Sequence, residues 1–351
     1  MNTRIWGRVV AALGLAFGAA VVAPAADKTK PAQPNAQMQA VLDQLAALGP
    51  KPIVTLTPQE ARVQPSPGDA VKALLKKQGK DTDPEPVGQV KDMDIPGPTG
   101  KIPVRTYTPK GNGPFPVLVY WHGGGWVLAD LNTYDASARA LCNAAGCVVV
   151  SCDYRHAPEH PFPAAADDAF AAYQWVLGHA ADLGGDPKKV AVAGESAGGN
   201  LAAVTCLRAR DRNVAAPVYQ VLIYPVTNND FDTPSYREHG DAKPLNVKMM
   251  KWFFAHYLGN QPSVARHPYA FPLQAADHQK LPRATIITAE IDPLRSDGKM
   301  YADKLEKAGV KVTYQNFEGV PHEFFGMGAV VDDAKKAVAK AAEGLKTAYG
   351  K

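Results

Sequence analysis

The chain has 351 residues, enough to bury a large hydrophobic core, and this length fits a single α/β domain with additions better than two independent domains. Its composition, 46% hydrophobic and 21% charged, is that of an ordinary globular protein. The formal net charge of +4 is not strongly basic, so a nucleic-acid partner is not expected.

The first 25 residues have the pattern of a secretory signal. Arg4 and Arg8 precede an apolar run over residues 9–22, and Ala23-Pro24-Ala25 then offers the small residues that a signal peptidase reads. The run is shorter than the ~18 apolar residues of a spanning helix, so we expect no stable membrane anchor, with a retained anchor as the alternative. We predict cleavage after about Ala25 and export to the periplasm or the extracellular space.

The 4 cysteines would meet an oxidising compartment after export, where disulfides are allowed. Cys147 and Cys152 lie in or beside an apolar strand and Cys206 lies in a helical stretch, which favours buried free thiols. If a disulfide exists, Cys142 with Cys147 is the first candidate. No C-x-x-C pattern is present, so we predict no metal site.

Residues 26–85 read as a linker followed by helices. The first helix has apolar residues at helical spacing and ends at Gly49-Pro50. A second helical region opens at Thr57, where Pro58 suits the first turn and Glu60 completes a capping box, and it breaks near Pro65. These helices are expected to pack over the mouth of the main domain. The apolar stripes that carry this prediction are Met38, Val41, Leu42, Leu45 and Leu48, followed by Val71, Leu74 and Leu75.

Residues 86–351 alternate strands with helices. Two extended runs, 87–95 and 102–107, resemble an antiparallel hairpin. Further strands are predicted at 117–120, 147–152, 190–193, 218–224, 284–289 and 312–317, with helices beginning near Tyr134, Ala164, Ala197, Leu294 and Val330. Such alternation implies a mostly parallel sheet covered by helices on both faces, with ligands at the carboxyl ends of its strands.

One segment, at about 228–272, interrupts this alternation and is too long for a simple crossover. It contains a predicted helix over 247–258 with an aromatic cluster from Trp252 to Tyr257. We expect the insertion and the N-terminal helices to form a lid that is apolar on its inner side.

The sequence G-E-S-A-G-G-N at 194–200 joins an apolar strand to a helix. In that setting G-x-S-x-G is a sharp turn that exposes the serine hydroxyl, and Gly194 and Gly198 supply the room for it. A plain tight turn is the alternative. Upstream, H-G-G-G-W at 122–126 follows a strand, and its glycines can turn N–H groups toward one point, as an oxyanion requires. A phosphate loop is the alternative there, although no Lys-Ser/Thr or G-x-G-x-x-G spacing accompanies it. His122 is expected to fix this loop.

These motifs, in order, resemble the bacterial hormone-sensitive-lipase-like esterases. The resemblance runs from about Leu56 to the C-terminal helix. It implies an α/β-hydrolase fold with an eight-stranded sheet and a helical cap. It also implies no metal or organic cofactor and hydrolysis of carboxylic esters with short to medium acyl chains. The motifs that carry it are H-G-G-G-W at 122–126, D-Y-R-H-A-P-E at 153–159, G-E-S-A-G-G-N at 194–200, D-P-L-R-S-D-G at 292–298 and V-P-H-E-F-F at 320–325.

By this resemblance Ser196 is the nucleophile, Asp292 the acid and His322 the base, in the chain order of α/β-hydrolases. Glu290 and Asp297 stand close enough in sequence to compete for the acid's role, but only Asp292 is expected in the loop just past its strand. The oxyanion N–H groups are assigned to Gly124, Gly125 and Ala197.

This chain departs from the family pattern at Glu195, where many members have Asp, at His156, where Leu is usual, and at Ser296, where a second acid is usual. Glu195 is expected to support the site. Asp153, Arg155 and Glu159 are expected to form a salt-bridged supporting loop.

The expected partner is a small-molecule ester, and a homodimer is compatible with the sequence. Two other functions stay open: an amidase or formamidase with the same triad, and a non-catalytic binding protein of the same fold.

Overall fold

The computed structural model describes residues 1–3, 32–259 and 261–351. The predicted signal segment falls outside them, apart from its first three residues. Residues 32–351 form one compact unit, to which the description below applies. Among the described residues, no helix combines the length and apolarity that crossing a membrane requires.

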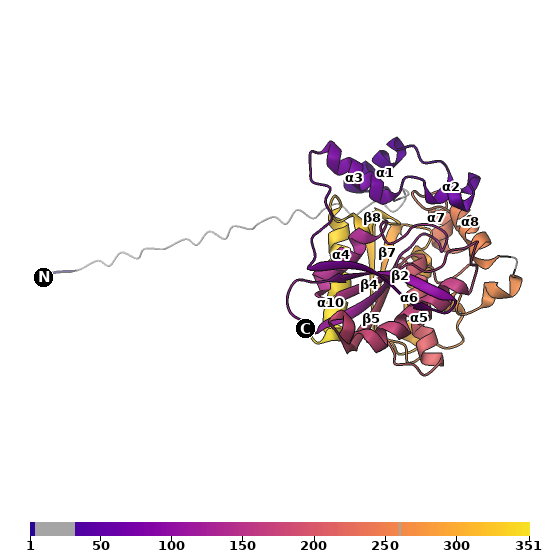
Figure 1. The fold of residues 1–351 in the computed structure, drawn as a ribbon. Helices are drawn as coiled ribbons and strands as arrows, with labels where there is room; N and C mark the ends of the chain where they lie inside the picture. Colours follow the sequence, from indigo (N-terminus) through magenta and orange to yellow (C-terminus); the bar gives the residue numbers. More distant parts are fainter. Residues whose placement is uncertain (4–31, 260) are drawn as a thin grey trace. The chain divides into compact units, whose positions relative to one another are not determined.

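The centre of the unit is an 8-stranded sheet with the strand order β1-β2-β4-β3-β5-β6-β7-β8 (Figure 1). β1 and β2 form the predicted antiparallel hairpin, β2 pairs antiparallel with β4, and every other neighbouring pair is parallel. The prediction of a mostly parallel sheet is therefore confirmed. The strands are β1 (Gln89–Gly97), β2 (Gly100–Thr108), β3 (Phe115–Trp121), β4 (Val148–Cys152), β5 (Gly185–Glu195), β6 (Gln220–Ile223), β7 (Ala284–Ile291) and β8 (Val312–Pro321).

Alternate residues of each strand face opposite sides of the sheet, and both sides are covered by helices. In β3, Val117, Val119 and Trp121 join one hydrophobic cluster, whereas Leu118 and Tyr120 join the other. The first cluster lies under α5 (Ala164–His179), α6 (Ala197–Asp211) and α9 (Arg295–Lys307), and the second under α4 (Asp135–Ala145) and α10 (Asp332–Tyr349).

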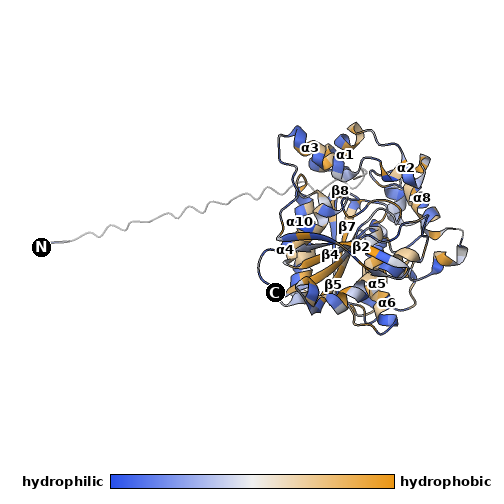
Figure 2. Ribbon diagram, in the orientation of Figure 1, coloured by the Kyte–Doolittle hydropathy of each residue, from blue (hydrophilic) through white to orange (hydrophobic). Residues whose placement is uncertain are grey.

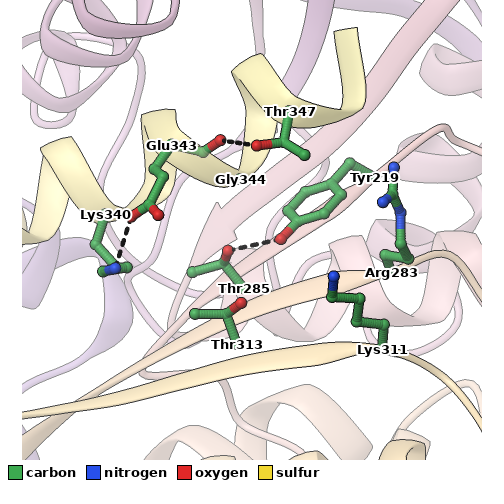
Figure 3. A pocket seen from close by; sticks show the side chains of 9 residues that line it. All are labelled: Tyr219, Arg283, Thr285, Lys311, Thr313, Lys340, Glu343, Gly344 and Thr347. Atoms are coloured by element: carbon green, nitrogen blue, oxygen red, sulfur yellow. Dashed lines mark hydrogen bonds and ion pairs between the residues drawn. The ribbon is translucent and has the colours of Figure 1, made fainter. Parts of the chain in front are cut away.

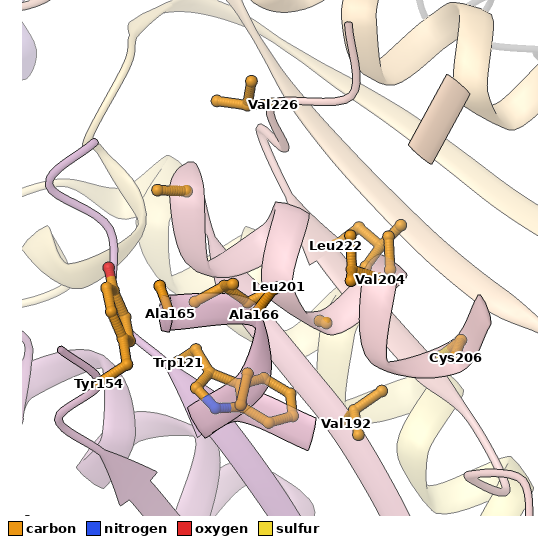
Figure 4. Close-up of a cluster of buried hydrophobic side chains, with 14 of the residues drawn as sticks. Trp121, Tyr154, Ala165, Ala166, Val192, Leu201, Val204, Cys206, Leu222 and Val226 are labelled. Carbon is orange, nitrogen blue, oxygen red and sulfur yellow. The ribbon is translucent and has the colours of Figure 1, made fainter. Parts of the chain in front are cut away.

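Both cores are visible in the figures. Figure 4 shows part of the first cluster, in which Trp121, Val192 and Leu222 of the strands lie with Leu201 and Val204 of α6. The central strands β4 and β5 are strongly hydrophobic, while the surrounding helices carry hydrophilic segments (Figure 2). Burial on both faces is why these strands read as apolar runs in the sequence.

The N-terminal helices are α1 (Ala36–Ala47), α2 (Pro58–Arg62) and α3 (Pro67–Lys77). Thr57 and Glu60 form the predicted capping box of α2, and Ser66 and Asp69 form a second box that restarts the helix as α3. Met38 of α1 is fully buried in the core.

The insertion between β6 and β7 contains α7 (Pro234–Glu238) and α8 (Val247–Leu258), the latter with the predicted bounds. The indole ring of Trp126, from the glycine-rich loop, stacks on Tyr257 of α8 with ring centroids 3.9 Å apart. Short 3-10 turns complete the chain at Ile53–Thr55, Ala181–Leu183, Pro262–Arg266, Pro272–Gln274 and Phe325–Met327.

All four cysteines are buried free thiols, as the apolar surroundings predicted. The alternative of a Cys142–Cys147 bridge is not realised. Burial raises the pKa of each thiol above its ordinary value.

Candidate active site

Ser196 occupies the turn between β5 and α6 and has an unusual backbone, with φ 55° and ψ −116°. The turn is held by the Ser196 N–H, which donates to the carbonyl of Ile223 at 2.9 Å. A Cβ atom at Gly194 would lie 2.2 Å from the Gly198 carbonyl oxygen, and one at Gly198 would lie 1.9 Å from that of Trp121. Side chains are therefore excluded from both positions, as predicted for a strained turn that presents a serine.

Three side chains predicted to act together meet at the carboxyl ends of β5, β7 and β8. The Oγ atom of Ser196 lies 3.0 Å from Nε2 of His322, and Nδ1 of the same ring lies 2.7 Å from Oδ2 of Asp292. Ser196 is 5% exposed, His322 2% and Asp292 0%. The other carboxylate oxygen of Asp292 accepts the N–H of Leu294 at 2.8 Å, so this side chain also organises the start of α9.

The hydrogen bonds determine which nitrogen of His322 carries the proton. A carboxylate can only accept, so Nδ1 donates to Asp292 and Nε2 is free to accept the proton of Ser196. Burial alone would lower the pKa of His322, but the charge and hydrogen bond of Asp292 more than offset it and the pKa is raised overall. The ring is therefore a stronger base than an ordinary histidine.

Glu290 and Asp297, the two other acids near Asp292 in sequence, accept hydrogen bonds from backbone N–H groups. Oε2 of Glu290 accepts the N–H of Gly319 at 2.7 Å. Asp297 is fully buried in the first turn of α9, as a partner of its dipole would be, but it also accepts the N–H groups of Thr227 and Asn228 at 3.1 and 3.0 Å. It therefore anchors the loop after β6, and neither acid is bonded to His322.

The N–H groups of Gly124, Gly125 and Ala197 donate no hydrogen bond within the part of the chain that the structure describes. Gly124 and Gly125 have φ of 93° and 60°, which favours glycine, and Ala197 is the first residue of α6, where N–H groups lack helical partners. A Cβ at Gly125 would lie 2.2 Å from the ring of Phe253, so α8 covers this loop closely.

Glu195, the residue before Ser196, is 1% exposed and is held by phenols. The Tyr120 hydroxyl donates to Oε1 at 2.6 Å and the Tyr224 hydroxyl donates to Oε2. Burial, together with the charge of Glu323, raises the pKa of Glu195 to about 7, although the tyrosines oppose this. Glu195 is thus a buried, hydrogen-bonded group directly before the nucleophile in the chain, and its supporting role stays a prediction.

Sequence reasoning missed the phenols and Glu323. The Tyr134 hydroxyl donates to both carboxylate oxygens of Glu323 at 2.7 Å, and Oε1 of Glu323 lies 3.7 Å from Nε2 of His322. The one available signal was the position of Glu323 directly after the base. Nothing near Tyr134 in the sequence indicated that it would reach the site.

The loop over 153–159 is salt-bridged as predicted. Arg155 makes two hydrogen bonds of 2.8 Å to the carboxylate of Asp168, and Glu159 pairs with Arg62 of α2 at 2.7 Å. Asp153 differs, because it faces two histidines instead of an arginine.

A separate hollow of about 170 Å³ lies at the opposite, amino-terminal edge of the sheet. Figure 3 shows the residues that line this hollow. Tyr219, Arg283 and Lys311 directly precede β6, β7 and β8, and the other side of the hollow is formed by residues of α10. It contains none of the residues predicted to act on a substrate.

A strained serine, a histidine oriented by a carboxylate and N–H groups left without partners beside them are the components of nucleophilic acyl transfer. Residues 118–326 match the protein family described as having the alpha/beta hydrolase fold. The chain belongs to this family, and its resemblance to the hormone-sensitive-lipase-like esterases is confirmed.

The individual proteins that this chain resembles include carboxylesterases and an esterase. The chain is 45% identical over 253 residues to carboxylesterase NlhH of Mycobacterium tuberculosis, covering 70% of this chain and 78% of that one. It is 44% identical over 243 residues to the carboxylic ester hydrolase LipN of the same organism, covering 68% of this chain and 65% of LipN. Among solved structures, the hyperthermophilic esterase of the archaeon Pyrobaculum calidifontis is similar with a TM-score of 0.81 and 40% identity, covering 90% of this chain and 98% of that one.

Proposed function

We propose that this enzyme hydrolyses carboxylic esters with short to medium acyl chains through an acyl-enzyme on Ser196. Ester hydrolysis rests on the similarity to named carboxylesterases and esterases across most of the catalytic domain. The single observation that carries the mechanism is the continuous hydrogen-bonded path from Ser196 through His322 to Asp292.

In the first half of the reaction, Nε2 of His322 takes the proton of Ser196 while Oγ attacks the ester carbonyl. The N–H groups of Gly124, Gly125 and Ala197 stabilise the negative oxygen of the tetrahedral intermediate. His322 then gives the proton to the leaving alkoxide, and the alcohol departs.

In the second half, His322 removes a proton from water, which attacks the acyl group on Ser196. Collapse of the second tetrahedral intermediate releases the carboxylic acid and returns the proton to Oγ. Asp292 keeps its negative charge throughout, holds the ring in its working tautomer and stabilises the imidazolium.

Two features of the cap support a preference for short to medium chains. Phe253 fills the space against Gly125, and Phe253, Phe254 and Tyr257 of α8 are buried in the core. A bulky acyl chain would have to displace well-packed aromatic groups, at a cost of about 1–3 kcal/mol or more.

The test is a substrate screen on the purified protein with p-nitrophenyl esters of graded chain length, matching anilides and an N-formyl substrate. We expect kcat/KM to be highest for a short or medium ester and negligible for the anilides. Faster turnover of an anilide or of the N-formyl substrate would identify an amidase or formamidase. No turnover of any substrate would favour a binding protein.

Export is also part of the proposal, since the pattern of residues 1–25 supports a cleaved signal. N-terminal sequencing of the protein from its native compartment should begin at about Ala26. An intact Met1 in exported protein would contradict cleavage and favour a retained anchor. Sedimentation of the same material distinguishes a homodimer from a monomer.

A further inference from the structure

A second cluster of polar side chains lies beside the glycine-rich loop and is not used in the proposed reaction. Asp153 Oδ1 lies 3.4 Å from Nε2 of His122 and 3.8 Å from Nε2 of His156. All three atoms lie within 4.8 Å of one another, and each is buried without a hydrogen-bond partner. Buried polar atoms without a hydrogen-bond partner are uncommon in folded proteins, so three of them in one place require an explanation.

The hydrogen bond at the other ring nitrogen of His122 determines which nitrogen carries the proton. Nδ1 of His122 lies 2.8 Å from the carbonyl oxygen of Gly123, and a carbonyl can only accept, so Nδ1 carries a proton. In the neutral ring Nε2 is then a lone pair that faces the carboxylate of Asp153. Two acceptors facing each other repel, and both atoms are buried without a hydrogen-bond partner in the structure.

We propose that His122, Asp153 and His156 form a binding site for a divalent transition-metal ion, with Zn²⁺ as the best match. Two imidazoles and a carboxylate are typical zinc ligands, bound at about 2.0–2.2 Å. Tetrahedral ligands at that length are separated by roughly 3.3 Å. The separations of 3.4 and 3.8 Å are close to this value, so small side-chain rotations complete the site.

The surroundings suit a metal. A ligating histidine commonly donates its other N–H to a carbonyl, as His122 does to Gly123. The side chain of Asp153 is 30% exposed, which leaves an entry path and room for a water molecule as the fourth ligand.

The site would tie two segments of the chain together. The ring of His122 stacks on Tyr154 with centroids 4.5 Å apart, and the Tyr154 hydroxyl donates to the carbonyls of His122 and Gly123 at 3.0 and 3.1 Å. A metal ion between His122 and the 153–156 segment would therefore brace the glycine-rich loop. None of its ligands belongs to the Ser196, His322 and Asp292 set, so the ion acts on the stability of the loop and not on the bonds that react.

The test is calorimetric titration of the tag-free, chelator-treated full chain with ZnCl₂. We expect one Zn²⁺ per chain, with affinity reduced at least about a hundredfold in His156→Leu and in Asp153→Asn. His160→Leu is the matched control, because His160 is an exposed histidine four residues along the same loop and should bind as wild type. Asp153→Asn nearly preserves shape and keeps the test informative if His156→Leu folds poorly.

A second readout is independent of turnover. Zn²⁺ should raise the Tm of the wild type and of His160→Leu but not that of His156→Leu. Zinc binding that His156→Leu leaves within about threefold would place the metal elsewhere and overturn the proposal. So would the absence of binding tighter than millimolar.

Discussion

The two ends of the same parallel strands contrast sharply. At the carboxyl ends, Ser196, Asp292 and His322 are bonded to one another and almost wholly buried. At the amino ends, Arg283 and Lys311 line a hollow, are exposed, and make no side-chain hydrogen bond or ion pair within the described residues.

The difference follows from what covers each end. The carboxyl ends lie under α8, whose Phe253 closes on Gly125, and the exclusion of water there strengthens every electrostatic interaction. The amino ends open to solvent, where isolated cations are well hydrated and interact weakly. Polar residues alone thus do not define a site in this fold, because orientation and desolvation must accompany them.

The largest expected effect is at Ser196. Ser196→Ala removes the nucleophile and should lower kcat by something on the order of a million-fold. A fluorophosphonate probe should label Ser196 in the wild type and leave the variant unlabelled. Retention of more than a few per cent of the activity by a correctly folded variant would show that the chemistry lies elsewhere.

The next effect concerns the acid. Asp292→Asn can still accept the N–H of Leu294 but holds His322 in the wrong tautomer, a change worth about ten-thousand-fold in a well-studied serine protease. Glu290→Gln and Asp297→Asn touch no part of His322 and should stay within roughly tenfold, about 1.4 kcal/mol on the barrier. The comparison requires kcat/KM at matched thermal stability. A crippled Glu290→Gln beside an active Asp292→Asn would reverse the assignment.

A smaller effect is the position of the acidic limb of the pH profile. His322 acts as a base only when unprotonated, so the rate rises with pH, and because its pKa is raised the midpoint should lie above about 6.5. Asp292→Asn removes the largest of the raising interactions, the charge of Asp292, so the limb of its residual activity should move to lower pH. An unmoved limb would mean that another group titrates.

The smallest effect is expected at the amino ends. Arg283→Ala combined with Lys311→Ala removes exposed charges that lie outside the reaction, and kcat/KM should stay within about twofold. Measurements at low and at moderate salt would expose any long-range effect of charge. A tenfold loss of kcat/KM at both salt concentrations would show that the amino ends of the strands contribute to the reaction and would contradict this prediction.

Much of this arrangement was predictable because its signals are local. Thr57 with Glu60 gives a capping box, and Gly194 with Gly198 marks a turn that only small residues permit. The triad followed from motifs in a fixed order. The bounds predicted for the helix over 247–258 are those of α8.

Contacts between distant segments were not predictable in the same way. Tyr120 and Tyr224 meet at Glu195 only because β3, β5 and β6 are neighbours whose residues at the carboxyl edge share a face. Asp297 lies close to the triad acid in sequence, whereas its carboxylate holds the loop after β6. Strand order and side-chain direction decide such contacts, and no short stretch of sequence encodes either of them.

The buried cysteines have a practical consequence for spectroscopy. All 4 cysteines of the chain are buried thiols whose pKa is raised, so they react slowly with maleimides and similar reagents. A cysteine introduced at the exposed Ala255 of α8 would be the fastest-reacting thiol in the native protein. A fluorophore or spin label could then be attached at that single point without first removing the native cysteines. Such a reporter on the cap would test whether the cap moves during turnover.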